Sequence, residues 1–214
     1  MFLLPLAATI VAAFFTANTW RAAMRSQSKA LATWSFALAQ FSVASAALTW
    51  GVAFGWSSPL YRVFYLFGAI VNVIWLALGT VRLLLPDTVW RWFTFVAVVA
   101  LSLVAVVATA RTPLVAGAAH ALATERIPRP SRVMPDRVRL LGVWYSVGGS
   151  VVVLAGLAWS LSRRRRHALG LALLAAGVIV VGVAGELAHV GLVAGFSACL
   201  AAGVAIMYAG FLRA

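Results

Sequence analysis

The chain has 214 residues, of which 64% are hydrophobic and only 10% are charged, whereas soluble domains average roughly 45–50% and about 25%. Its 17 basic and 4 acidic residues give a formal net charge of +13. This composition excludes a soluble globular fold, because a chain of this length cannot hide so much apolar surface from water.

Seven long apolar segments follow one another, and the charged residues lie between them or near their ends. About 20 helical residues, rising about 1.5 Å each, cross a hydrocarbon core of about 30 Å. The segments are continuously apolar, which favours helices over the alternating strands of a membrane barrel. We therefore expect an all-α membrane protein, a seven-transmembrane helix bundle with spans at about 2–20, 32–55, 60–83, 90–110, 140–161, 168–187 and 189–212.

The first segment, residues 2–20, is expected to stay in the mature protein. A cleaved signal peptide carries basic residues before its apolar stretch, whereas Arg21, Arg25 and Lys29 come after this one. With the N-terminus outside, 10 of the 17 basic residues lie on the inner side and 7 on the outer. Because basic loops stay in the cytoplasm, we expect the N-terminus outside and the C-terminus cytoplasmic.

The side chains of the segments 32–55 and 60–83 form two matching stripes. In 60–83 the stripe holds polar, aromatic and glycine residues at spacings of three and four: Tyr61, Tyr65, Gly68, Asn72, Trp75 and Gly79. In 32–55 it comprises Thr33, Ala37, Gln40, Ala44, Ala47 and Gly51.

An amide in the middle of a membrane needs a partner, so Asn72 is expected to face other helices. One interpretation is a packing seam in which Asn72 makes one interhelical hydrogen bond. The alternative is a ligand site or solute path lined by Asn72, Tyr65 and Gln40.

The one long connection, residues 111–139, is basic and rich in proline, and the predicted orientation places it outside. Pro128, Pro130 and Pro135 interrupt any helix across this stretch, so we expect at most a short interfacial helix near 114–124.

The last two segments carry two further patterns. Small residues at helical spacing predict a close helix contact on one face of 189–212: Gly191, Gly195, Ala198, Ala202, Ala205 and Ala209. Glu186 and His189 lie three residues apart at an expected membrane interface. They predict an interfacial hydrogen-bonded pair, with proton or ligand binding and a metal site as alternatives.

The expected partners are lipids and other membrane proteins. The cluster Arg163, Arg164, Arg165 and Arg166 is typical of a topology anchor that attracts anionic lipid headgroups. A membrane-protein partner or a homo-oligomer is also expected. Nucleic acid is not, because no soluble module accompanies the charge.

The spans contain no lysine for retinal, no histidine pair for haem and no paired carboxylates, so we expect no cofactor. The leading hypothesis is a non-enzymatic sensing, scaffolding or accessory module. A small-solute or ion transporter or channel is the alternative, and a membrane-embedded enzyme comes third.

The residues GW at 55–56, YRVFYLFGA at 61–69 and LGT at 78–80 resemble a pattern of uncharacterised multi-pass membrane proteins of high-GC, actinobacterial-type bacteria. This resemblance implies a multi-pass protein of a bacterial inner membrane. It implies no activity.

Overall fold

Helices make up nearly all of the structure. The computed structural model describes residues 2–84, 89–163, 168–190 and 192–213. Within these residues lie seven helices long and apolar enough to cross a membrane, and no strand. The predicted all-helical fold with seven candidate membrane spans is therefore confirmed. The spans are α1 (Leu3–Ser26), α2 (Lys29–Phe54), the continuous run α3–η1–α4, α5 (Val89–Arg111), α8 (Asp136–Arg163), α9 (Ala168–Val190) and α10 (Val193–Arg213).

The third span is a helix of three parts. It begins as α3 (Ser58–Tyr65), widens into one π-helical stretch, η1 (Leu66–Val71), and continues as α4 (Asn72–Leu84). The sequence predicted a regular helix here. Regular spacing therefore describes the two ends of this span but not its middle.

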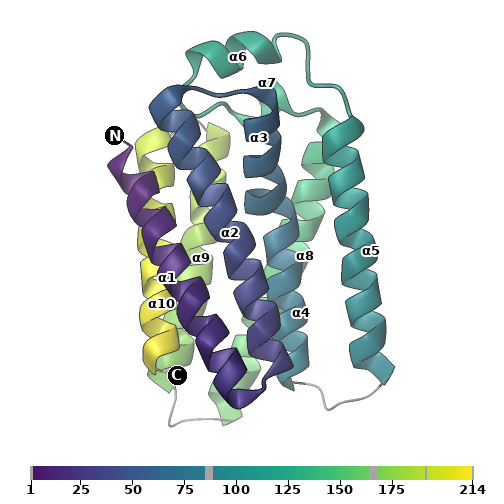
Figure 1. Ribbon diagram of the computed structural model, residues 1–214, viewed down its shortest axis with the longest axis vertical. Helices are drawn as coiled ribbons and strands as arrows, with labels where there is room; N and C mark the ends of the chain where they lie inside the picture. The colour runs from purple at the N-terminus through teal and green to yellow at the C-terminus, as the bar shows by residue number, and fades with distance from the viewer. Residues whose placement is uncertain (1, 85–88, 164–167, 191, 214) are drawn as a thin grey trace.

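The spans form one bundle with α2 and α4 near its centre (Figure 1). Helix α1 packs against α2 and α10, α2 against α4, α4 against α8, and α9 against α10. The N-terminus lies at the same end as the short helices α6 (Ala118–Thr124) and α7 (Pro130–Val133), and the C-terminus lies at the opposite end. We call residues 112–135 the cap, and the two ends of the bundle the cap end and the opposite end.

Short turns with defined caps join the first three spans. Gln27 takes a left-handed conformation (φ 52°) after α1, and the Ser28 side chain then accepts a hydrogen bond from Leu31 N at the start of α2. At the cap end, Gly55 (φ 98°) ends α2, and Ser57 caps α3 in the same way as Ser28 caps α2. These turns make α1 and α2 antiparallel neighbours, and likewise α2 and α3.

The helices extend past several of the predicted span ends. Helix α1 continues from the expected end at residue 20 to Ser26, and α8 starts at Asp136, ahead of the expected residue 140. Charges marked the ends in the sequence, but long basic side chains can reach water from the last turns of a helix. In the cap, α6 lies within the expected stretch 114–124, whereas α7 was not expected.

The prediction for the contact face of the last span is wrong. Of the predicted stripe, Ala198, Ala202 and Ala205 are exposed, and Gly191 lies outside the described residues. Helices α9 and α10 instead meet at glycines spaced by seven residues. A Cβ built on Gly203 would lie 3.1 Å from Gly177 O, and one built on Gly210 would lie 2.8 Å from Gly170 O.

This glycine contact has a physical reason. Phe196, Leu200, Val204 and Met207 of α10 are buried, so the larger apolar residues share the packed face with the glycines. The alanines face outward, where lipid tails are as apolar as the helix itself.

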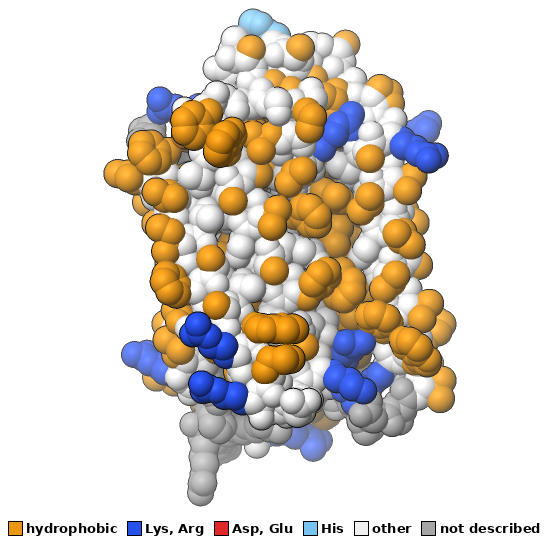
Figure 2. All heavy atoms as spheres, in the orientation of Figure 1, with side chains coloured by type: hydrophobic (Ala, Val, Ile, Leu, Met, Phe, Trp, Pro, Cys, Tyr) orange, Lys and Arg blue, Asp and Glu red, His pale blue; other side chains and the backbone are white. Residues whose placement is uncertain are grey.

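Helix α5 is the least buried span. Only Ala105 and Thr109 of its residues are buried, and it stands at the edge of the bundle (Figure 1). Figure 2 shows hydrophobic side chains over the middle of the molecule and basic side chains gathered towards both ends. This distribution is the one expected of a surface that contacts hydrocarbon in its middle and headgroups at its ends.

Candidate functional site

The contact between α2 and the third span is fixed by small residues. A Cβ built on Gly68 would lie 3.4 Å from Ala44 Cβ, and one built on Gly79 would collide with the Trp34 ring. All six members of the stripe predicted for α2 are buried. Because the two helices are antiparallel and Ala44 lies against Gly68, the register puts Gln40 opposite Asn72.

These two amides are buried without hydrogen bonds to their oxygens. Gln40 is 6% exposed and Asn72 is 4% exposed, which agrees with the expectation that Asn72 faces other helices. Within the described residues, Gln40 Oε1, Asn72 Oδ1 and Trp34 Nε1 have no partner. The interhelical hydrogen bond expected for Asn72 is therefore not made by its oxygen. A buried acceptor without a donor costs about 1–3 kcal/mol, so the seam contains polar atoms that water or a polar ligand could satisfy.

The π-helical stretch η1 ends directly before Asn72 and packs against α8. Gly142 of α8 meets Tyr65, and Gly149 meets Val73. The π-helical turn of the third span lies between these two contacts. Such turns often occur at functional sites. Sequence reasoning missed η1 because it assumed the spacing of a regular α-helix along the whole span.

Tyr65 lies two helical turns from Asn72, towards the cap end. It is 5% exposed, and its hydroxyl lies 2.9 Å from the position of a Cβ built on Gly142. The structure therefore brings Gln40 and Asn72 to one level and leaves Tyr65 at another. We call the level of Gln40 and Asn72 the polar seam.

A second set of buried polar groups ties the cap to the spans. Trp56 Nε1 donates to Arg126 O (2.8 Å), and the Tyr61 hydroxyl donates to Pro128 O (3.0 Å). The Arg62 guanidinium donates to Thr109 O and to Thr112 O, the latter at 2.9 Å, and so caps the end of α5. Trp56, in the turn before the third span, and Tyr61 and Arg62, in its first turns, therefore hold the start and the middle of the long connection.

The cap also has contacts of its own. Glu125 accepts a hydrogen bond from Arg129 N (3.1 Å) and forms an ion pair with Arg132 (3.4 Å). Val115 N donates to Val133 O (3.2 Å), which joins the two halves of the segment. Sequence reasoning singled out Tyr61 only as part of a stripe and did not predict these contacts, because backbone acceptors carry no sequence signal.

The remaining predicted residues lie apart from both sets. Glu186 is exposed in the last turn of α9, and the side chain of His189 lies outside the described part, so their pairing stays a prediction. Arg163 ends α8 with its guanidinium 4.6 Å from the Trp159 ring centre, while residues 164–166 lie outside the described part.

Among the residues that the structure describes, no group of three or more His, Cys, Asp and Glu side chains could hold a metal ion. Two sites therefore combine residues singled out in the sequence with buried polar atoms. One is the polar seam, and the other is the set of hydrogen bonds from Trp56, Tyr61 and Arg62 to the cap. Comparison of the chain with protein-family models, with curated proteins and with solved structures finds no significant match in any of the three.

Proposed function

We propose that the protein is a non-enzymatic scaffold of a bacterial inner membrane that holds the cap in one fixed shape for a membrane-protein partner or a second copy. In this proposal the N-terminus and the cap lie outside and the C-terminus lies in the cytoplasm.

The observation that carries the proposal is the set of ties from Trp56, Tyr61 and Arg62 to the cap backbone. Each buried hydrogen bond is worth about 1 kcal/mol. Tyr61 is fully buried, and its ring packs against that of Trp56 (5.4 Å between centres). A loop that only connects two spans does not need such ties, whereas a surface that is recognised in one shape does.

In-cell photo-crosslinking tests the proposal. A photoreactive residue at the exposed position His120 of α6 should give a discrete adduct, and one at Ile179, 54% exposed on α9, should not. The double variant Trp56→Phe, Tyr61→Phe keeps an aromatic ring at both positions but removes both donors. The adduct yield should then fall several-fold at unchanged protein level. An adduct yield that does not respond to the double variant would contradict the proposed role of the cap.

The polar seam supports a second candidate, a small-solute or ion transporter. Gln40 and Asn72 have buried amide oxygens without partners at one level beside a π-helical turn, and such groups can line a path for a polar solute. The close contact of Gly68 with Ala44 favours a closed seam instead.

Asn72→Leu separates the two candidates, with Gly68→Leu as the comparison. If the seam only packs, Asn72→Leu should leave the free energy of unfolding unchanged or raise it by up to about 1–3 kcal/mol, because it removes a buried acceptor that makes no hydrogen bond. Gly68→Leu should cost about 1–3 kcal/mol by overpacking against Ala44. Thermal unfolding in detergent and solute flux in proteoliposomes measure both effects. A stable Asn72→Leu protein that loses a flux present in the wild type would establish transport and overturn the scaffold.

A further inference from the structure

The polar seam lies in a closed part of the bundle. Towards the cap end, Gly68 packs on Ala44, because a Cβ built on Gly68 would lie 3.4 Å from Ala44 Cβ. Towards the opposite end, Gly79 lies so near the Trp34 ring that a Cβ built on it would collide with that ring. Contacts between α2 and the third span therefore close the seam along the bundle on both sides of the two amides.

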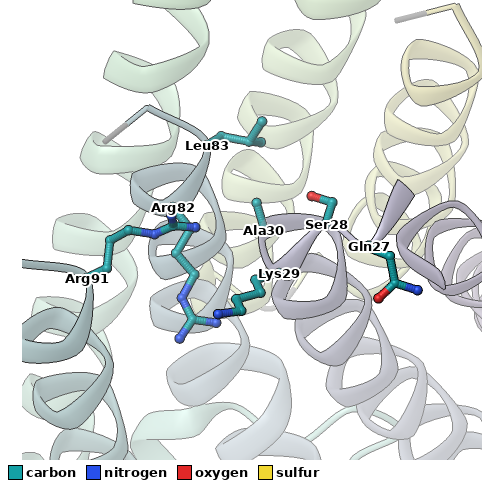
Figure 3. Close-up of a pocket in the computed structure, with 7 residues that line it drawn as sticks. All are labelled: Gln27, Ser28, Lys29, Ala30, Arg82, Leu83 and Arg91. Atoms are coloured by element: carbon teal, nitrogen blue, oxygen red, sulfur yellow. The ribbon is translucent and has the colours of Figure 1, made fainter. Parts of the chain in front are cut away.

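The open pocket at the end opposite the cap lies apart from the seam. Figure 3 shows this pocket between the start of α2, the end of α4 and the start of α5. Two residues of its lining, Ala30 and Arg82, each lie ten residues from the nearer amide along their own helix, which is about 15 Å. The contact of Trp34 with Gly79 lies between the two levels. A molecule in the seam is therefore separated from this pocket.

Two acceptors at the level of the seam need a donor. Gln40 Oε1 and Asn72 Oδ1 are buried and have no hydrogen-bond partner among the residues that the structure describes. Buried polar atoms in folded proteins are nearly always paired, either with protein groups or with ordered water. A ligand that donates to both oxygens would satisfy the two helices at once.

The charges around the seam favour a neutral ligand over an ion. Within the described part of the chain, the acidic side chains are Glu125, Asp136 and Glu186, and all three lie on helices or turns at the cap end. No described carboxylate therefore lies at the level of the seam to balance a cation, and an anion would face two amide oxygens. A charge without a counter-charge is costly inside a membrane.

Water fits the two acceptors in number and in kind. A water molecule has two hydrogens to donate, one for each amide oxygen, and buried waters typically make two to four hydrogen bonds. The NH₂ group of either amide is a donor that the water oxygen can accept from. Water-mediated hydrogen bonds are nearly as favourable as direct ones, so a bridge of this kind can hold two helices together.

We propose that one bound water molecule donates to Gln40 Oε1 and Asn72 Oδ1 and so joins α2 to the third span where η1 ends. This water is a fixed part of the structure and not one of a file that crosses the membrane, because close contacts shut the seam on both sides. The inference does not depend on the scaffold proposal, which concerns the cap. It also gives the two amides a role that does not require transport.

A double-mutant cycle of the two amides tests the bridge. Gln40→Met and Asn72→Leu keep the size of each side chain but remove its acceptor. Each single variant should lower the Tm by about 2–4 °C, because the other amide then loses its bridged partner. The double variant should have a Tm at or above that of the wild type, because no acceptor is left unpaired. Single variants with a Tm at or above the wild type, and effects that add, would refute the bridge.

Ser45→Ala is the matched control. Ser45 Oγ is also buried without a partner, but it lies five residues from Gln40 along α2. Its effect on the Tm should therefore add to that of Asn72→Leu. Coupling as strong as that between the two amides would show that the cycle reports general repacking of α2, and would overturn the proposal.

Two further measurements identify the ligand. An experimental density map of the wild type should contain one peak at about 2.7–3.2 Å from both amide oxygens, and the map of the double variant should lack it. The Tm of the wild type should not change when Na⁺, K⁺ or choline is exchanged at constant ionic strength. A direct contact of the two side chains without a peak, or a Tm that depends on the cation, would contradict a bound water.

Discussion

Single glycines set how closely the helices of this bundle approach one another. Gly148 and Gly149 are neighbours on α8 but have opposite surroundings. A Cβ built on Gly149 would lie 2.7 Å from Val73 Cγ1 and 3.0 Å from Val73 O, whereas one built on Gly148 would meet nothing within 4 Å. The same helix therefore contains a glycine required by packing beside one that is not.

We expect Gly149→Ala and Gly148→Ala to have opposite effects on stability. Gly149→Ala should lower the free energy of unfolding by about 1–3 kcal/mol, because the backbone of α4 cannot yield as a flexible side chain would. Gly148→Ala should raise it by about 0.5–1 kcal/mol, because alanine loses less backbone entropy in a helix. Chemical or thermal unfolding in one detergent measures both variants, and equal effects would contradict the packing of α8 on α4.

The burial of individual residues could be predicted from the sequence better than the residues that each one contacts on a neighbouring helix. The α2 stripe and Asn72 are buried as expected, because apolar and small residues at helical spacing mark the packed face. The height of Gln40 relative to Asn72 along the bundle depends on the register between α2 and α4. That register follows from contacts such as Gly68 with Ala44, and a single helix contains no information about it.

At the scale of helices, the spacing of glycines predicts the contact face of a helix better than the spacing of small residues in general. Gly142, Gly149 and Gly156 recur every seven residues on α8, and each lies against the third span at Tyr65, Val73 or Thr80. On α10, Gly203 and Gly210 have the same spacing and meet α9. Alanines at the predicted positions face outward, because an alanine is tolerated on a lipid-facing surface as well as in a contact.

The π-helical stretch η1 shows why one element escaped prediction altogether. The stretch η1 lies between Tyr65, whose hydroxyl meets Gly142 of α8, and Val73, whose backbone meets Gly149. An α-helix of the same length would turn Asn72 and the residues after it away from their present neighbours. The wider turn thus joins α3, which packs on α2, to α4, which packs on both α2 and α8.

At the scale of the whole molecule, the two ends differ in how they use basic residues. At the cap end, Arg62 binds backbone carbonyls and Arg132 pairs with Glu125. At the opposite end, Lys29, Arg82 and Arg91 surround one pocket. The proposed orientation places this end, with 10 of the 17 basic residues, on the cytoplasmic side.

Reporter fusions test the orientation. Fusions after residues 28 and 164 should report the cytoplasm, and a fusion near residue 130 should report the outside, because 10 basic residues on the inner side exceed 7 on the outer.

The replacement of Arg164, Arg165 and Arg166 by glutamine lowers the inner count from 10 to 7 and leaves the two sides equal. This variant should insert in both orientations, so that each fusion gives a mixed signal. The matched replacement of Arg126, Arg129 and Arg132 removes as many charges from the cap and should leave the wild-type pattern unchanged. A cytoplasmic signal near residue 130 in the wild type would invert the orientation and move the cap to the inside, although the seven spans and the contacts between them would stand.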